Sequence, residues 1–123
     1  MLENDRNKRV LVVDDDEAIL RFVRILLQSS FEVKTALGGR RGLEELDGFK
    51  PDIVLLDLRM PDVDGPAFYR EFRSRGFTAP VLIFSAFGAS EAQEELGAQG
   101  SVAKPFGPEQ LIQAIRNLPA EHF

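Results

Sequence analysis

Acidic, hydroxyl-bearing and basic side chains stand at the ends of four short apolar runs in this sequence. Asp14 and Asp15 follow the first run, Asp57 the second, Ser85 the third and Lys104 the fourth. Neighbouring carboxylates destabilise one another unless a cation or proton lies among them, and Mg²⁺ prefers such hard oxygen ligands. A lysine adds a compact positive charge, and a serine hydroxyl can donate to a phosphoryl oxygen. If these side chains converge, they can form a phosphoryl-transfer centre with an aspartate as nucleophile.

Asp57 is the carboxylate at the centre of this hypothesis, and on its own it allows two interpretations. It ends the apolar run Ile53–Leu56, and the loop after it carries Asp62, Asp64 and Gly65. Aspartate at the end of a strand is often only a turn former. Ligands of open α/β sheets, however, bind beyond the carboxyl ends of the strands. We interpret Asp62 and Asp64 as turn formers, whereas the role of Asp57 depends on the rest of the chain.

Strands and helices alternate along the chain, and this order determines where the reactive side chains lie. The predicted strands are 9–13, 31–36, 53–56, 80–84 and 101–104, and the predicted helices are 17–30, 39–46, 66–76, 90–96 and 108–118. Such alternation predicts a parallel sheet with right-handed crossovers and helices on both faces. We therefore expect an α/β flavodoxin-like (βα)5 sandwich, doubly wound, with a five-stranded parallel sheet in the order 2-1-3-4-5. All four strand ends would then meet at one edge.

The spacing of apolar residues predicts which helix faces are buried. In the helix 17–30, which Asp16 is expected to cap, the predicted inward face consists of Ile19, Phe22, Val23, Leu26 and Leu27. In the third helix Phe68 and Phe72, four residues apart, are expected to face the core. The fourth helix, 90–96, is expected to be short because glycines follow it closely.

The bulk composition indicates one globular domain spanning residues 1–123, with residues 1–7 expected to be flexible and 119–123 a tail. The net charge is −5 and the pI about 4.9, which argues against direct nucleic-acid binding. The chain has no cysteine, so disulfides and thiolate chemistry are excluded, and the composition fits a cytoplasmic protein. The longest uncharged run, 76–90, is too short for membrane insertion.

Four motifs resemble those of the receiver domains of two-component response regulators, with a chemotaxis-regulator-like pattern. They are Val12–Asp15, Leu56–Gly65, Ser85-Ala86 and Lys104-Pro105-Phe106. The resemblance covers nearly the whole chain, and the four motifs in this order and spacing are very specific. It implies the same fold as the one predicted from the strand and helix order.

The resemblance also implies a role for each residue near the acidic cluster. Asp57 matches the aspartate that accepts the phosphoryl group and becomes an aspartyl phosphate. Asp14 and Asp15 match the acidic pair around Mg²⁺, with Asp15 as a direct ligand and Asp14 acting through water. Asp57 itself belongs to the metal site, and Arg59 matches the position whose backbone carbonyl binds the ion. Mg²⁺ is therefore the expected cofactor.

Two further positions match residues that act on the phosphoryl group. Ser85 matches the hydroxyl residue that moves to the phosphoryl oxygen, and Lys104 matches the lysine that pairs with the acyl phosphate. Lys104-Pro105 matches a peptide bond that is cis in the family, and only bonds before proline adopt cis at modest cost.

The implied function is that of a phospho-accepting signalling domain in a phosphorelay. A sensor histidine kinase or a histidine phosphotransfer protein is the expected donor. No effector domain lies within the 123 residues, so we expect the signal to pass by contact with a downstream protein. The chain is not expected to be an enzyme beyond self-phosphorylation from small donors and autodephosphorylation.

The sequence departs from the family pattern at two places. Ser101 stands where many receivers carry Tyr or Phe, so the usual aromatic coupling to the output surface is absent. The segment from Ser85 to Lys104 is also about three residues shorter than in chemotaxis-type receivers, by comparison with the motif spacing of that family. Phosphorylation is therefore predicted more firmly than a conventional output mechanism.

Two other functions stay open at this point. One is a pseudo-receiver, which would bind proteins without taking phosphate. The other is a phosphatase of the haloacid dehalogenase type, with Asp14 as nucleophile and Asp16 as acid. That family favours Thr or Val two residues after its second aspartate, where this chain has Ala18.

Overall fold

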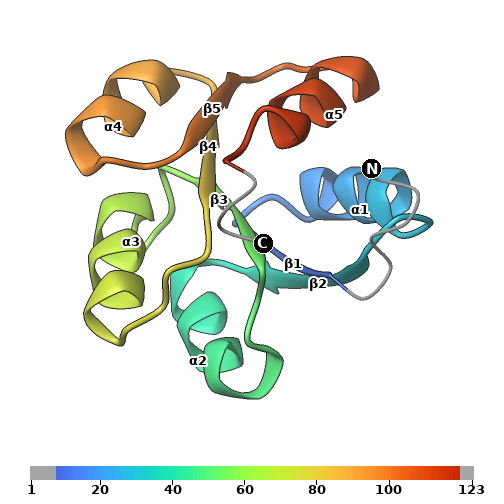
Figure 1. Ribbon diagram of the computed structural model, residues 1–123. Helices are drawn as coiled ribbons and strands as arrows, with labels where there is room; N and C mark the ends of the chain where they lie inside the picture. The colour runs from blue at the N-terminus through green and yellow to red at the C-terminus, as the bar shows by residue number, and fades with distance from the viewer. Residues whose placement is uncertain (1–7, 120–123) are drawn as a thin grey trace.

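Five strands and five helices alternate in the computed structural model, which describes residues 8–119 (Figure 1). The strands are β1 (Arg9–Asp14), β2 (Glu32–Leu37), β3 (Ile53–Asp57), β4 (Val81–Ser85) and β5 (Gly100–Ala103). The helices are α1 (Glu17–Leu27), α2 (Gly39–Phe49), α3 (Gly65–Ser74), α4 (Ala89–Leu96) and α5 (Pro108–Arg116). The predicted flexible segment 1–7, and the predicted tail 119–123 apart from Pro119, lie outside the described residues.

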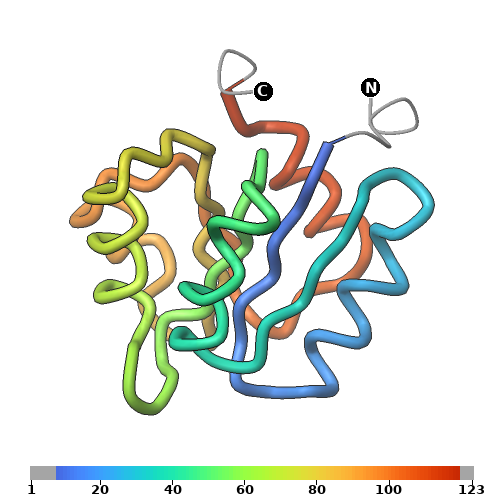
Figure 2. Tube along the Cα trace, turned by 90° about the horizontal axis from the view of Figure 1, so that it is seen from below, coloured from blue at the N-terminus to red at the C-terminus, as the bar shows by residue number. Residues whose placement is uncertain are grey.

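The strands form one parallel sheet in the order β2-β1-β3-β4-β5, which confirms the predicted flavodoxin-like fold. Figure 2 shows β2, β1 and β3 running side by side in the same direction. Asp57 pairs in register with Phe84, and Ser85 with Ala103. The carboxyl ends of the strands therefore come to one edge of the sheet.

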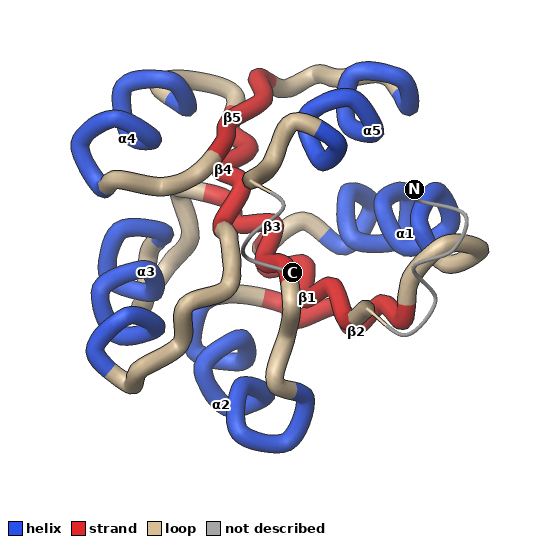
Figure 3. The backbone as a smooth tube through the Cα atoms, in the orientation of Figure 1, coloured by secondary structure: helices blue, strands red, loops and turns tan. Residues whose placement is uncertain are grey.

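Helices cover both faces of the sheet, α1 and α5 on one side and α2, α3 and α4 on the other (Figure 3). Each side has its own apolar core. Every residue of β3 and β4 is buried, which explains why both strands are apolar without alternation. Phe68 and Phe72 are fully buried and stack with their ring centroids 5.8 Å apart, as their spacing predicted.

The buried face of α1 differs from the predicted one. Leu20, Val23 and Leu27 are its buried residues, whereas Phe22 is 38% exposed. A residue missing from the prediction, Leu20, therefore takes the central position, because positions 20, 23 and 27 follow one helical face. Phe22 lies at the side of that face, with its ring 6.1 Å from the ring of Phe106.

Several predicted boundaries shift by a few residues. Helix α1 ends at Leu27 rather than Ser30, and α2 continues to Phe49 rather than Leu46 because Phe49 is also buried. Helix α4 has 8 residues, of which only Ala89 is buried, so its predicted shortness is confirmed. Among the described residues, no helix combines the length and apolar character needed to span a membrane.

The carboxyl end of α4 is tied to α3 by a group of polar side chains. Arg73 on α3 donates to the carbonyl of Ala79 at 2.8 Å and to Oε1 of Gln99 at 2.8 Å. Gln99 in turn donates to the carbonyl of Gly97 at 3.0 Å, and the Tyr69 hydroxyl donates to the same carbonyl at 3.2 Å. These bonds fix the turn that joins α4 to β5.

Candidate functional site

Lys104 links two buried carboxylates at the carboxyl edge of the sheet. Its Nζ lies 2.7 Å from Oδ2 of Asp14 and 3.3 Å from Oδ1 of Asp57. Asp14 is fully buried and Asp57 is 5% exposed. The ends of the strands β1, β3 and β5 thus bring together residues separated by up to 90 positions. The single positive charge of Lys104 neutralises only one of the two negative charges of Asp14 and Asp57.

Asp15 completes an acidic cluster with Asp14 and Asp57. One carboxylate oxygen from each residue lies within 4.8 Å of the others. Asp15 is exposed while the other two are buried, so the cluster opens to solvent on the side of Asp15. This set of hard oxygen donors fits Mg²⁺, which binds through one or two carboxylates and keeps several waters. The predicted metal-binding acids therefore lie together.

The other predicted site residues surround this cluster. Ser85 is buried at the end of β4, and its carbonyl accepts a hydrogen bond from the Lys104 amide at 2.8 Å. Arg59 lies in the exposed loop two residues after Asp57. The Lys104-Pro105 peptide bond is cis, as the resemblance implies.

Burial and charge shift the pKa values of the three central groups. Burial raises the pKa of Asp14 from 3.8 to about 6, although the hydrogen bond from Lys104 opposes this. Burial also raises the pKa of Asp57, against the attraction of Lys104. Burial acts to lower the pKa of Lys104, but its bonds to Asp14 and Asp57 outweigh this and leave that pKa raised. The lysine is therefore charged at neutral pH, and the carboxylates favour an added cation.

The loop after Asp57 is held by Gly65 and by turn residues. The Gly65 amide donates to the carbonyl of Leu58 at 2.8 Å, and a Cβ at Gly65 would lie 2.5 Å from the carbonyl oxygen of Asp57. Asp64 caps α3 by accepting from the Ala67 amide at 2.9 Å. This confirms the interpretation of Asp64 as a turn former, and Gly65 is required because its backbone touches the backbone of the site.

Aromatic rings contact two basic side chains around the site. The Lys104 Nζ lies 5.0 Å from the ring centroid of Phe84, which precedes Ser85 on β4. The guanidinium of Arg59 lies 6.0 Å from the ring centroid of Phe87, a residue that is 71% exposed. Phe84 is the last residue of the predicted strand 80–84, and no spacing rule on the sequence joins residues 59 and 87.

The geometry gives no support to the phosphatase alternative. Asp14, its nucleophile, is fully buried and accepts hydrogen bonds from Lys104 and from the Asp16 amide at 3.0 Å. Asp16, its acid, caps α1 by accepting from the Ala18 amide at 2.9 Å. Both carboxylates are thus committed to other contacts.

The sequence is similar to a known protein family and to several characterised proteins. The profile of the response regulator receiver domain matches residues 10–116. The chain is 33% identical over 114 residues to the alkaline phosphatase synthesis transcriptional regulatory protein PhoP of Bacillus subtilis, covering 89% of this chain and 48% of that protein. It is 38% identical over 116 residues to the KDP operon transcriptional regulatory protein KdpE of Escherichia coli, covering 87% and 49%. The chain spans about half the length of these relatives.

Solved structures show the same fold. The chemotaxis protein CheY4 of Vibrio cholerae superposes with a TM-score of 0.83 at 29% identity, covering 91% of this chain and 98% of that one. The response regulator TrrA of Thermotoga maritima, solved in complex with Mg²⁺-BeF, superposes with a TM-score of 0.80 at 28% identity, covering 92% and 100%.

The raised pKa of Asp14 predicts a pH dependence of stability. Because that pKa is higher in the folded state than its ordinary value of 3.8, the folded state binds more protons between about pH 4 and 6. This group therefore lowers the free energy of unfolding as pH rises through that window, by an amount on the order of 2 kcal/mol. Urea unfolding without divalent cations at pH 4.5 and pH 7 measures the change.

Asp14→Asn should remove most of this loss of stability between the two pH values, and the exposed Asp62→Asn should leave it unchanged. An equal loss in Asp14→Asn and the unaltered protein would contradict the assignment.

Gly65→Ala should destabilise the protein by about 1–3 kcal/mol, because the new methyl group meets rigid backbone. Gly48→Ala is the matched control, since nothing lies within 4 Å of a Cβ there and alanine favours the helix. Chemical denaturation of both variants tests the contact. Equal stabilities for the two variants would show that the loop at Asp57 can adapt.

Proposed function

The chain belongs to the response regulator receiver domain family, and we propose that Asp57 is its phosphoryl acceptor. The donor is the phosphohistidine of a sensor histidine kinase or a histidine phosphotransfer protein, and the exchange takes place in the cytoplasm. The observation that carries the proposal is a buried carboxylate, Asp57, whose Oδ1 lies 3.3 Å from the charged Lys104 and which shares its cluster with Asp14 and Asp15. The shape of this edge also leaves the cluster open to solvent on the side of Asp15.

The proposed reaction is a direct transfer between two side chains. A carboxylate oxygen of Asp57 attacks the phosphorus atom, the bond between phosphorus and the histidine nitrogen breaks, and the histidine leaves with the electron pair. Asp14, Asp15, Asp57 and the carbonyl of Arg59 would hold Mg²⁺, which neutralises charge on the phosphoryl oxygens when bound. Lys104 supplies the second positive charge, and its bond to Asp14 keeps it in position.

Ser85 connects the new aspartyl phosphate to the rest of the domain. The added charge of about −1.5 to −2 attracts hydrogen-bond donors, and the Ser85 hydroxyl is the donor at the end of the neighbouring strand. Its movement would shift the segment before α4 and bias an equilibrium between two conformations. A downstream protein would bind differently to the two conformations.

Relatives differ in what accompanies the receiver. One, a protein-glutamate methylesterase/protein-glutamine glutaminase of Koribacter versatilis, is 39% identical over 105 residues, and the match covers 29% of its length. We propose that residues 8–119 act as a phosphoryl acceptor and not as an enzyme on another substrate, beyond self-phosphorylation and autodephosphorylation.

Incubation with acetyl phosphate and Mg²⁺ should add one phosphoryl group, measured by intact mass. Asp57→Asn should abolish the gain because the amide oxygen is a poor nucleophile. Asp62→Asn, which alters an exposed carboxylate in the same loop, should keep it. Chelation of Mg²⁺ should reduce the gain at least tenfold.

A phosphohistidine-bearing kinase serves as the second donor in this experiment. Failure to gain phosphate from either donor would favour the pseudo-receiver, and a gain that survives Asp57→Asn would move the acceptor to another residue.

A further inference from the structure

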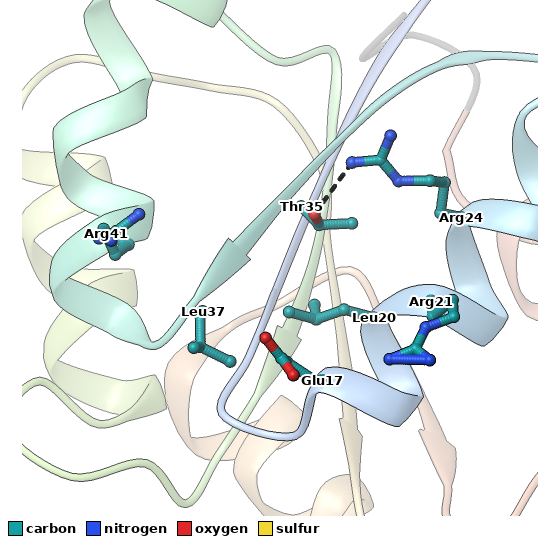
Figure 4. A pocket seen from close by; sticks show the side chains of 7 residues that line it. All are labelled: Glu17, Leu20, Arg21, Arg24, Thr35, Leu37 and Arg41. Carbon is teal, nitrogen blue, oxygen red and sulfur yellow. Dashed lines mark hydrogen bonds between the residues drawn. The ribbon is translucent and has the colours of Figure 1, made fainter.

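We propose that the open edge of β2 binds an extended acidic segment of a partner protein. The edge borders a groove of about 460 Å³ lined by α1, β2 and the start of α2 (Figure 4). Three arginines line it, two from α1 and one from α2, together with two leucines, a threonine and one acid: Arg21, Arg24, Arg41, Leu20, Leu37, Thr35 and Glu17. This surface lies outside the Asp57 cluster and is not needed for the phosphoryl transfer.

The backbone of β2 has hydrogen-bonding groups on the side away from β1. Among residues 8–119, β2 is the terminal strand of the sheet and pairs only with β1. The amides of Glu32 and Gly38 donate to carbonyls on the β1 side. Since alternate residues of a strand direct their backbone groups to opposite sides, those of Val33, Thr35 and Leu37 face the open edge. Such an edge can pair with an extended peptide through its main chain.

The groove carries more positive than negative side chains. Arg24 donates to the Thr35 hydroxyl at 3.2 Å, whereas neither Arg21 nor Arg41 has a carboxylate partner among residues 8–119. The neighbouring Lys34 and Arg40, by contrast, pair with acids at 3.3 and 3.7 Å. Three arginines against one glutamate form a local positive surface on a chain whose net charge is −5, which selects an acidic occupant.

The apolar side chains of the groove favour a peptide over a nucleic acid as its occupant. Leu37 is 46% exposed in the groove beside Leu20. Phosphates of a nucleic acid would engage the arginines but would leave Leu37 and the open backbone of β2 without partners. A strand that alternates acidic and apolar residues satisfies all three features.

The position of the groove gives the occupant a defined place relative to the phosphoryl site. Leu37 pairs in register with Asp14, and Glu17 follows directly on Asp14–Asp16. The exposed apolar residues of α1, Phe22 and Ile25, lie outside the lining of this groove. α1 therefore presents separate basic and apolar surfaces, and a partner can bind the basic one whether or not Asp57 is phosphorylated.

The test uses labelled ten-residue peptides and the whole chain, with fluorescence anisotropy at low and physiological salt. A peptide of alternating glutamate and valine should bind, and the corresponding lysine–valine peptide should not. A glutamate–proline peptide of equal charge, which cannot form a strand ladder, should bind at least tenfold more weakly. Binding should persist in Asp57→Asn, so this outcome is independent of the proposed phosphorylation.

Variants and amide exchange then locate the peptide. Arg21→Glu/Arg24→Glu and Arg41→Glu should each weaken binding at least tenfold, and the double control Arg70→Glu/Arg116→Glu, at exposed arginines outside the groove, should change it less than twofold. The bound peptide should slow hydrogen exchange at the amides of Val33, Thr35 and Leu37.

Four results would overturn the proposal. They are no binding of the glutamate–valine peptide at millimolar concentration, equal binding of the proline peptide, unchanged exchange at these amides, and binding of anionic phosphatidylserine vesicles in place of the peptide.

Discussion

The bond between Lys104 and Asp14, at 2.7 Å, is the interaction on which the site depends. Two carboxylates buried side by side would be costly without a positive charge between them. Lys104 provides this positive charge. The parallel sheet positions the lysine, because its aligned strand ends bring residues 14, 57 and 104 together. The cost of burial leaves the carboxylates with raised pKa values, so this edge of the protein favours an added cation.

Much of this arrangement could be predicted from the sequence because strand ends in a parallel sheet share an edge. The strands β3 and β4 are fully buried, and their uninterrupted apolar residues make them easy to recognise in the sequence. The prediction that Asp57 and Ser85 lie at the carboxyl ends of these strands is therefore confirmed. The face of α1 was harder to predict, since seven large apolar residues lie on this short helix and packing against β1 and β2 decides which of them are buried. Contacts such as that of Arg59 with Phe87 join two loops, and no periodicity reports the distance between loops.

The residues of β5 near the Asp57 cluster depart from the family pattern at Ser101. Ser101 is half-buried on β5, and its small side chain has no ring to move between buried and exposed positions. On the proposed function, a change at Ser85 would reach the rest of the domain through the backbone of the segment 86–88 and through α4. The exposed Phe87 is the large side chain of that segment, and it already contacts Arg59 on the other side of the site.

The polar contacts of Arg73 and Gln99 give α4 unequal ends. Its carboxyl end is bound to α3 through Gly97, while its amino end begins after Gly88 without a side-chain cap. A force applied at Ser85 would therefore swing the helix about a fixed pivot rather than slide it. With 8 residues at about 1.5 Å each, the arm is roughly 12 Å long. On the proposed function, the amplitude would be greatest at the first turn of α4 and smallest at Gly97.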